Sequence, residues 1–114
     1  MITVPMPAMD DAMSPTVKPG DLCTVALIAS CLTRNPDYDY TLHHNKLICM
    51  IYGTFHDGGE LFIRRMCKGA KKGDFDIIPD NPIWKTYPFI EDGIQGQFHL
   101  VGEVRAILTI IPTA

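Results

Sequence analysis

The hydrophobic residues of this chain fall in short runs, which glycine, proline, asparagine and aspartate separate. The runs rarely keep the 3.6-residue period of an amphipathic helix, and their lengths are typical of strands. The pattern predicts strands over residues 22–28, 46–54, 61–66, 74–79 and 97–111. The last of these is either one bent strand or a strand pair. We therefore expect a mostly-β domain of many short strands with little helix.

Glycines and prolines predict where the chain turns between these runs. Residues 56–59 end in Gly58 and Gly59, which is typical of a hairpin turn because glycine tolerates a positive φ. Residues 35–40 combine a proline with polar side chains, which predicts a loop. Gly102 interrupts the last run, and a glycine inside a strand predicts a bulge or the close approach of another backbone.

The length of 114 residues fits one domain, and 46% hydrophobic with 20% charged residues suits a globular fold. We expect residues 1–10 to be the end of a linker with an edge strand, and residues 11–114 to form the domain itself. The net charge of −3 argues against direct contact with nucleic acid. The one basic cluster, residues 64–72, is more typical of a strand followed by a solvated turn.

The four cysteines, at positions 23, 31, 49 and 67, include no pair spaced as a zinc motif requires. We therefore expect no metal and no other cofactor. The sequence shows no signal peptide and no apolar segment long enough to cross a membrane. Free thiols in a reducing cytoplasm are the simplest interpretation.

The most specific motif surrounds Ala12, where residues 11–22 read DAMSPTVKPGDL. This segment resembles the Ser-Met-x-Pro-Thr-x-x-x-Gly-Asp signature of the LexA/signal-peptidase-like family of Ser–Lys peptidases, with alanine in place of the nucleophile. Residues 61–66, LFIRRM, resemble the strand that carries the catalytic lysine, and Arg64 stands at the position of that lysine. The resemblance implies a peptidase fold, a β-domain of several short, highly twisted antiparallel strands, without its catalytic dyad.

Other parts of the family pattern follow in the same order along the chain. Gly20 and Asp21 precede the first core strand, residues 80–82 resemble an Asn-Pro turn, and residues 101–104 resemble the closing strand. The resemblance covers residues 9–108. Arg64 cannot replace the lysine as a base, because the guanidinium pKa lies above about 12 and the group stays protonated.

A peptidase fold that has lost both catalytic groups implies a binding role. The double loss resembles repressors of P2-like temperate phages, in which this domain dimerises the protein and the dimers associate further. The resemblance implies that the chain binds copies of itself, with an antirepressor protein as a further candidate partner. It implies contact with operator DNA only through a separate helix-turn-helix domain, and no contact with a membrane.

The C-terminal stretch is apolar on both faces, whereas a strand open to water on one side alternates with polar residues. We therefore expect the dimer interface at Ile107, Leu108, Ile110 and Ile111. The alternative is a strand buried in the core of its own domain. From the tendency of the family to assemble near the catalytic site, we expect contacts between dimers at Asp10, Asp11 and Lys68.

Three rival interpretations stay open. Ser14 is an alternative nucleophile, although a serine before proline usually forms a turn. Cys49 or Cys67 is another, if paired with one of the histidines at positions 43, 44, 56 and 99. The third is an accessory subunit of a DNA-damage polymerase, built on the same fold.

Two further groups of residues are expected to be structural. Adjacent histidines point to opposite sides of an extended chain, so His43 and His44 are expected in a solvated loop and not at a metal. Trp84, with Tyr87 and Phe89, is expected at the edge of the core or of an interface.

Overall fold

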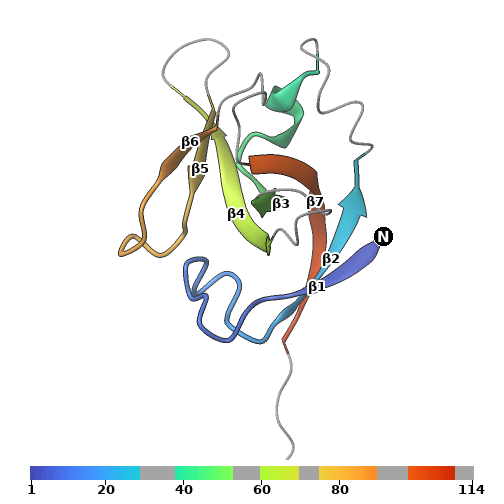
Figure 1. Cartoon of the computed structure of the whole chain (residues 1–114), viewed down its shortest axis with the longest axis vertical. Coiled ribbons are helices and arrows are strands. Elements are labelled where there is room, and N and C mark those ends of the chain that lie inside the picture. Colours follow the sequence, from blue (N-terminus) through green and yellow to red (C-terminus); the bar gives the residue numbers. More distant parts are fainter. Residues whose placement is uncertain (29–37, 53–59, 70–74, 90–97, 110–114) are drawn as a thin grey trace, which may run out of the picture.

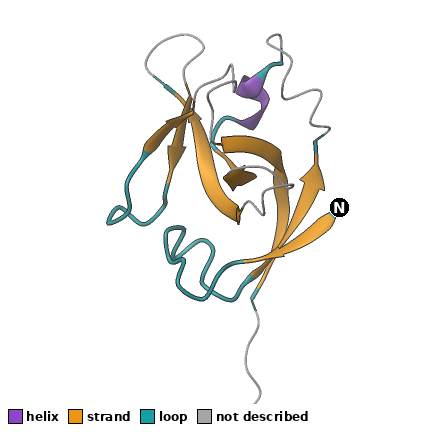
Figure 2. Ribbon diagram, in the orientation of Figure 1, coloured by secondary structure: helices purple, strands orange, loops and turns teal. Residues whose placement is uncertain are grey.

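The computed structural model describes residues 1–28, 38–52, 60–69, 75–89 and 98–109. Strands dominate this part of the chain and form one antiparallel sheet in the order β1-β2-β7-β3-β4-β5-β6 (Figures 1 and 2). The strands are β1 (Ile2–Pro5), β2 (Leu22–Leu27), β3 (Lys46–Tyr52), β4 (Glu60–Lys68), β5 (Phe75–Ile78), β6 (Tyr87–Phe89) and β7 (Phe98–Leu108). A short 3-10 helix, η1 (Tyr40–His43), is the one helix in the described ranges. The prediction of a mostly-β antiparallel domain is confirmed.

Each predicted apolar run contains a strand, with differences at the ends. The last run forms one strand of 11 residues, β7, and not a strand pair. β2 was expected to be buried along its length, but buried Cys23 and Val25 alternate with less buried residues, and Leu27 is exposed. β1 lies at one edge of the sheet, within residues 1–10. The predicted hairpin turn at 56–59 lies outside the described residues, although its flanking strands β3 and β4 pair antiparallel.

Gly102 lies where β7 passes close to β2, as predicted. A Cβ atom at this position would stand 2.3 Å from the carbonyl oxygen of Ala26 and 2.7 Å from Cγ1 of Val25. Neither distance is compatible with a side chain unless the backbone moves. The pairing register also shifts near this point, between Thr24 and Val25 of β2 and between Cys49 and Met50 of β3. These irregularities accompany the strong curvature of β7 in Figure 1.

The sheet buries a separate apolar cluster on each face. Neighbouring residues of β3 alternate between the two clusters, with Cys49 and Ile51 in one and Ile48 and Met50 in the other. The loop between β1 and β2 covers the first cluster with Met6, Met13 and Val17. Tyr40 of η1 joins Phe75 and Ile77 of β5 in the second. The motif around Ala12 thus lies in a loop that is packed against the sheet.

No helix in the described ranges is long and apolar enough to span a membrane.

Candidate functional site

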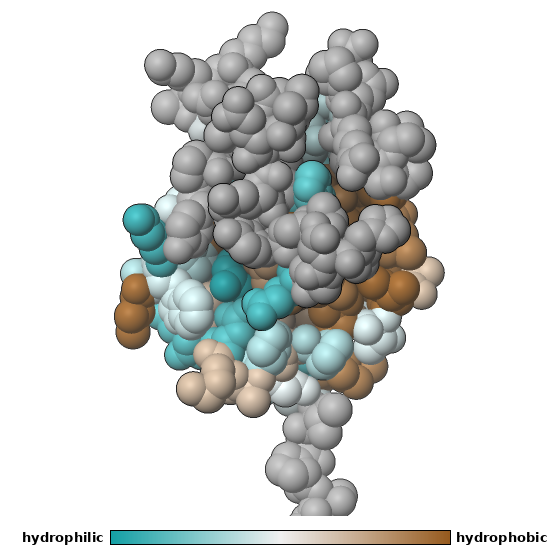
Figure 3. Space-filling model, viewed as in Figure 1, coloured by the Kyte–Doolittle hydropathy of each residue, from teal (hydrophilic) through white to brown (hydrophobic). Residues whose placement is uncertain are grey.

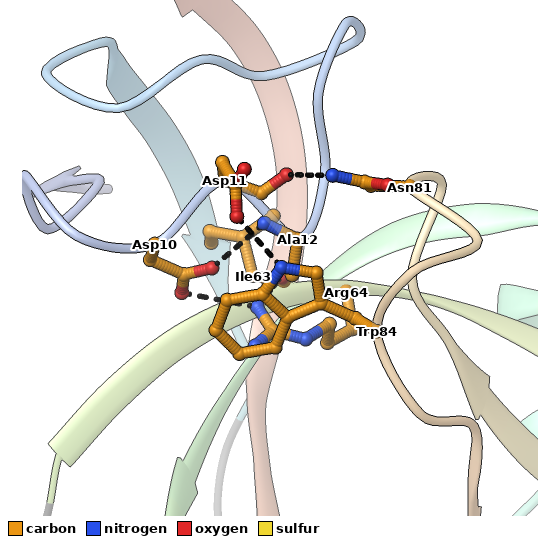
Figure 4. Close-up of polar contacts among 7 residues, drawn as sticks. All are labelled: Asp10, Asp11, Ala12, Ile63, Arg64, Asn81 and Trp84. Carbon is orange, nitrogen blue, oxygen red and sulfur yellow. Dashed lines mark hydrogen bonds and ion pairs between the residues drawn. The ribbon is translucent and has the colours of Figure 1, made fainter.

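The structure brings Ala12 and Arg64 together around the carboxylate of Asp10 (Figure 4). Oδ1 of Asp10 accepts a hydrogen bond from the backbone N–H of Ala12 at 3.1 Å. Oδ2 accepts one from Nη1 of Arg64, also at 3.1 Å. The side chains of Asp10 and Arg64 are only 13% and 14% exposed, and Ala12 is fully buried. The two positions that the family resemblance pairs therefore bind the same carboxylate. We call Asp10, Ala12, Arg64 and Trp84 the Asp10 cluster.

Arg64 is held by aromatic rings as well as by oxygen atoms. Its guanidinium carbon lies 5.3 Å from the ring centroid of Phe62 and 5.5 Å from that of Trp84. These distances are within the range of cation–π attraction. Nη1 also donates to the backbone carbonyl of Ile63 at 2.7 Å. Arg64 is therefore a fixed, permanently charged group, which binds anions but does not take up a proton.

Trp84 covers Arg64 from the loop between β5 and β6. Its indole Nε1–H donates to Oδ1 of Asp11 at 2.6 Å, and its backbone N–H donates to the carbonyl of Asn81 at 3.1 Å. The side chain is 40% exposed, so Trp84 does not belong to the buried core. The indole packs on the guanidinium of Arg64 and is partly open to solvent, and its expected place at the edge of the core or of an interface stays a prediction. The structure describes the backbone of Tyr87 and Phe89 in β6 but not their side chains.

The turn at residues 80–82 fastens the β5–β6 loop to the loop that carries Ala12. The backbone N–H of Asn81 donates to the carbonyl of Ala12 at 2.8 Å, and Nδ2 donates to the carbonyl of Asp11 at 3.2 Å. Asp80 accepts from the hydroxyl of Thr16 at 2.6 Å and from Nε and Nη2 of Arg65 at 2.9 and 2.8 Å. The hydrogen bonds from Arg65 hold the pKa of Asp80 below its ordinary value.

Ser14 lies in the turn that follows Ala12. Its backbone N–H donates to the carbonyl of Asp11 at 3.0 Å, and the residue is half-buried. A hydroxyl becomes an effective nucleophile only beside a base that takes its proton. Catalysis by Ser14 stays a hypothesis.

Buried cysteines are poor candidates for catalysis. Cys23 and Cys49 are fully buried. Burial raises the pKa of Cys49 to about 12, with a smaller contribution from Cys23. Burial and then the charge of Asp21 raise the pKa of Cys23 to about 11. Since the thiolate is the reactive form, neither residue is a nucleophile near neutral pH. Cys67 is half-buried, whereas Cys31 and His56 lie outside the described residues.

His43 corrects one prediction, because it is buried and not solvated. Nδ1 lies 3.1 Å from Oε2 of Glu103, and Nε2 lies 2.6 Å from the hydroxyl of Tyr38. A carboxylate only accepts, so Nδ1 donates to Glu103, while Nε2 and the hydroxyl of Tyr38 share the second hydrogen bond. His44 is exposed, and its Nδ1 accepts from the backbone N–H of Lys68. A glutamate inside an apolar strand was the sequence signal for this buried partner.

The residues predicted at interfaces lie in different environments. Ile107 is half-buried against the first core cluster, whereas Leu108 is exposed. Ile110 and Ile111 lie outside the described residues. Asp10 belongs to the Asp10 cluster, and Asp11 lies beside it. Lys68 is at the C-terminal end of β4, where it contacts His44. The structure therefore does not join Lys68 to the other two.

The Asp10 cluster offers binding groups and no catalytic pair. Ala12 has no nucleophilic atom, and Arg64 cannot act as a base. In the described ranges, no three histidine, cysteine or acidic residues are placed to hold a metal ion. No protein-family model matches the chain, and no curated protein matches it either.

Proposed function

We propose that this chain is the oligomerisation domain of a temperate-phage transcriptional repressor, built on a Ser–Lys peptidase fold that has lost its dyad. The observation that carries the proposal is the carboxylate of Asp10, which joins positions 12 and 64. In a peptidase of this family these two positions must meet. Here they meet as alanine and arginine, in a site covered by Trp84.

In this proposal the chain works in the cytoplasm of the bacterial host and maintains lysogeny by assembling repressor subunits. A separate helix-turn-helix domain contacts the operator. Joining two such domains makes the second DNA contact intramolecular, which raises avidity by roughly 10²–10⁴-fold. A symmetric dimer also matches the two halves of a palindromic operator. Induction then requires an antirepressor or another partner, because self-cleavage is lost.

The C-terminal part of β7 is the surface that favours self-association. β3 pairs with β7 only as far as Glu103, whereas β2 pairs with β7 as far as Leu108. In the described ranges, no strand pairs with the β3-facing edge from Val104 to Leu108, and this end of β7 pairs with β2 alone. An open strand edge beside an exposed leucine favours pairing with a second chain. Pairing with a copy of itself gives a closed, two-fold dimer.

A second apolar surface competes with this assignment. In Figure 3 hydrophobic residues gather on the side of the molecule formed by β1 and β2. Met1 and Leu27 are exposed on these strands or at their ends. Leu27 is 54% exposed and Leu108 is 56% exposed, so the same substitution at each residue is a matched pair.

A repressor fusion tests the proposal. A helix-turn-helix domain that binds its palindromic operator only as a dimer is joined to the N-terminus of the chain, and repression of a reporter gene is measured. We expect repression from the fusion, its loss in Leu108→Asp, where a charge enters the proposed interface, and its retention in Leu27→Asp. A fusion that does not repress contradicts the proposal. Loss of repression in Leu27→Asp alone moves the interface to β1 and β2.

A further inference from the structure

The carboxylate of Asp10 occupies its site as a ligand does. Each of its two oxygens has its own donor, the amide of Ala12 and the guanidinium of Arg64. The donors come from separate segments, the loop before β2 and the middle of β4. Asp10 itself directly follows an exposed stretch, residues 7–9, and its side chain turns into the site. The site is thus formed by the sheet and its packed loop, and the carboxylate reaches it from a surface segment.

We propose that Arg64 and the amide of Ala12 form a binding site for a peptide carboxylate, which Asp10 fills as an intramolecular ligand. The external ligand is an acidic side chain or a chain end of a protein partner. It replaces Asp10 with the same two donors, so the charge of Arg64 stays neutralised. The inference concerns the same residues as the proposed function, but it does not depend on the chain being a repressor.

The charge balance of the cluster selects a carboxylate over a neutral ligand. The side chain of Arg64 is largely removed from water, and a buried cation is costly unless an anion pairs with it. Phe62 and Trp84 attract the guanidinium but carry no negative charge to balance it. Any ligand that displaces Asp10 must therefore supply an anion at the same point. A guanidinium and a backbone N–H together suit the two oxygens of a carboxylate.

The surroundings of the cluster select a ligand with an apolar group beside its carboxylate. Met9 and Ile83 are both exposed, and they adjoin Asp10 and Trp84 in the sequence. Trp84 is held in place by Asp11, and the backbone N–H of Ile83 donates to Oδ1 of Asn81 at 3.2 Å. Apolar side chains on an anchored loop offer contact area at little cost in conformational entropy.

The tether of Asp10 makes it a strong competitor. A group joined to its site by a short segment acts at an effective concentration in the millimolar range. An external carboxylate therefore binds the native chain weakly, because only the fraction with a displaced Asp10 is competent. Removing the Asp10 carboxylate should reveal the affinity of the site.

N-acetyl-leucine, which has a carboxylate and an apolar side chain, is the probe, and N-acetyl-leucine amide is its neutral control. Binding is measured by titration calorimetry and by the fluorescence of Trp84, the only tryptophan in the chain. We expect Asp10→Ala to bind the acid about tenfold or more tightly than the unmodified chain, because the competing ligand is gone. We expect no binding of the amide, and loss of binding when Arg64→Met is added to Asp10→Ala.

Asp80→Asn is the matched control, because it removes the carboxylate partner of the neighbouring Arg65 and leaves Asp10 in place. It should not increase affinity for the acid. Circular dichroism shows whether Asp10→Ala folds. If it does not, Asp10→Ser gives the same test, because its hydroxyl oxygen still accepts from the amide of Ala12. If neither variant folds, the unmodified chain at high ligand concentration decides, since it must still respond to the acid and not to the amide.

Equal binding of acid and amide, or no gain in either folded variant, overturns the proposal. So does an Arg64→Met variant that still binds. None of these results depends on the oligomeric state, so they leave the assembly function to its own test.

Discussion

At the scale of the residue, one carboxylate explains how the region around Ala12 is held. Asp10 joins Ala12 to Arg64, while Asp11 receives the indole of Trp84. The sequence motif paired positions 12 and 64, and the structure places both at the Asp10 carboxylate, while their loss of catalysis stays a prediction. The sequence expectations placed Asp10 and Asp11 near this region but missed Trp84, because a contact between loops far apart in the sequence leaves no local pattern. Buried His43 was missed because a glutamate inside an apolar strand signals a buried partner but does not say which residue, 60 positions away, that partner is.

The buried thiols give a prediction at the same scale. Burial raises the pKa of Cys49 from an ordinary value of 9.0 to about 12, so the folded chain keeps this thiol protonated after the unfolded chain has lost the proton. The resulting stabilisation is complete below pH 9 and decreases as the pH rises toward 12. We expect the free energy of unfolding, measured with urea, to fall between about pH 8.5 and 10. The fall begins there because the unfolded chain loses its thiol proton at about the pKa of a free thiol. The fall should be smaller in Cys49→Ala. An identical pH slope in that variant contradicts the assignment.

At the scale of the element, the apolar runs predicted the strands well because each strand must fill one or both faces of the sheet. The alternation of buried and half-buried residues in β5 matches its sequence pattern. Strand order was beyond prediction, since β7 enters between β2 and β3 from the far end of the chain. The sequence did not decide whether residues 97–111 form one bent strand or a strand pair, because Gly102 permits a break as readily as a bend.

Gly102 offers a test at this scale. We expect Gly102→Ala to destabilise the fold by about 1–3 kcal/mol, because the added methyl group meets the backbone of Ala26 and forces β2 and β7 apart. Urea unfolding measures the change. Ala106→Ser, at an exposed position of the same strand, is the control and should stay within about 0.5 kcal/mol of the unmodified chain. A neutral Gly102→Ala variant would mean that the strands do not approach so closely.

At the scale of the whole molecule, the domain has its own buried core and still exposes apolar side chains at the ends of its strands. Loops pack on both faces, so the core of one chain is closed by its own residues. Two exposed leucines, Leu27 and Leu108, end β2 and β7 and lie outside both clusters. Apolar side chains in such places are typical of a module that associates through its edges.

Self-association of the unmodified chain is the central claim, and sedimentation velocity over a wide concentration range measures it most directly. We predict dimers at low concentration and larger discrete species as the concentration rises. A chain that stays monomeric at the highest concentration contradicts the assembly function, and the carboxylate site would then be the remaining candidate for what this protein binds.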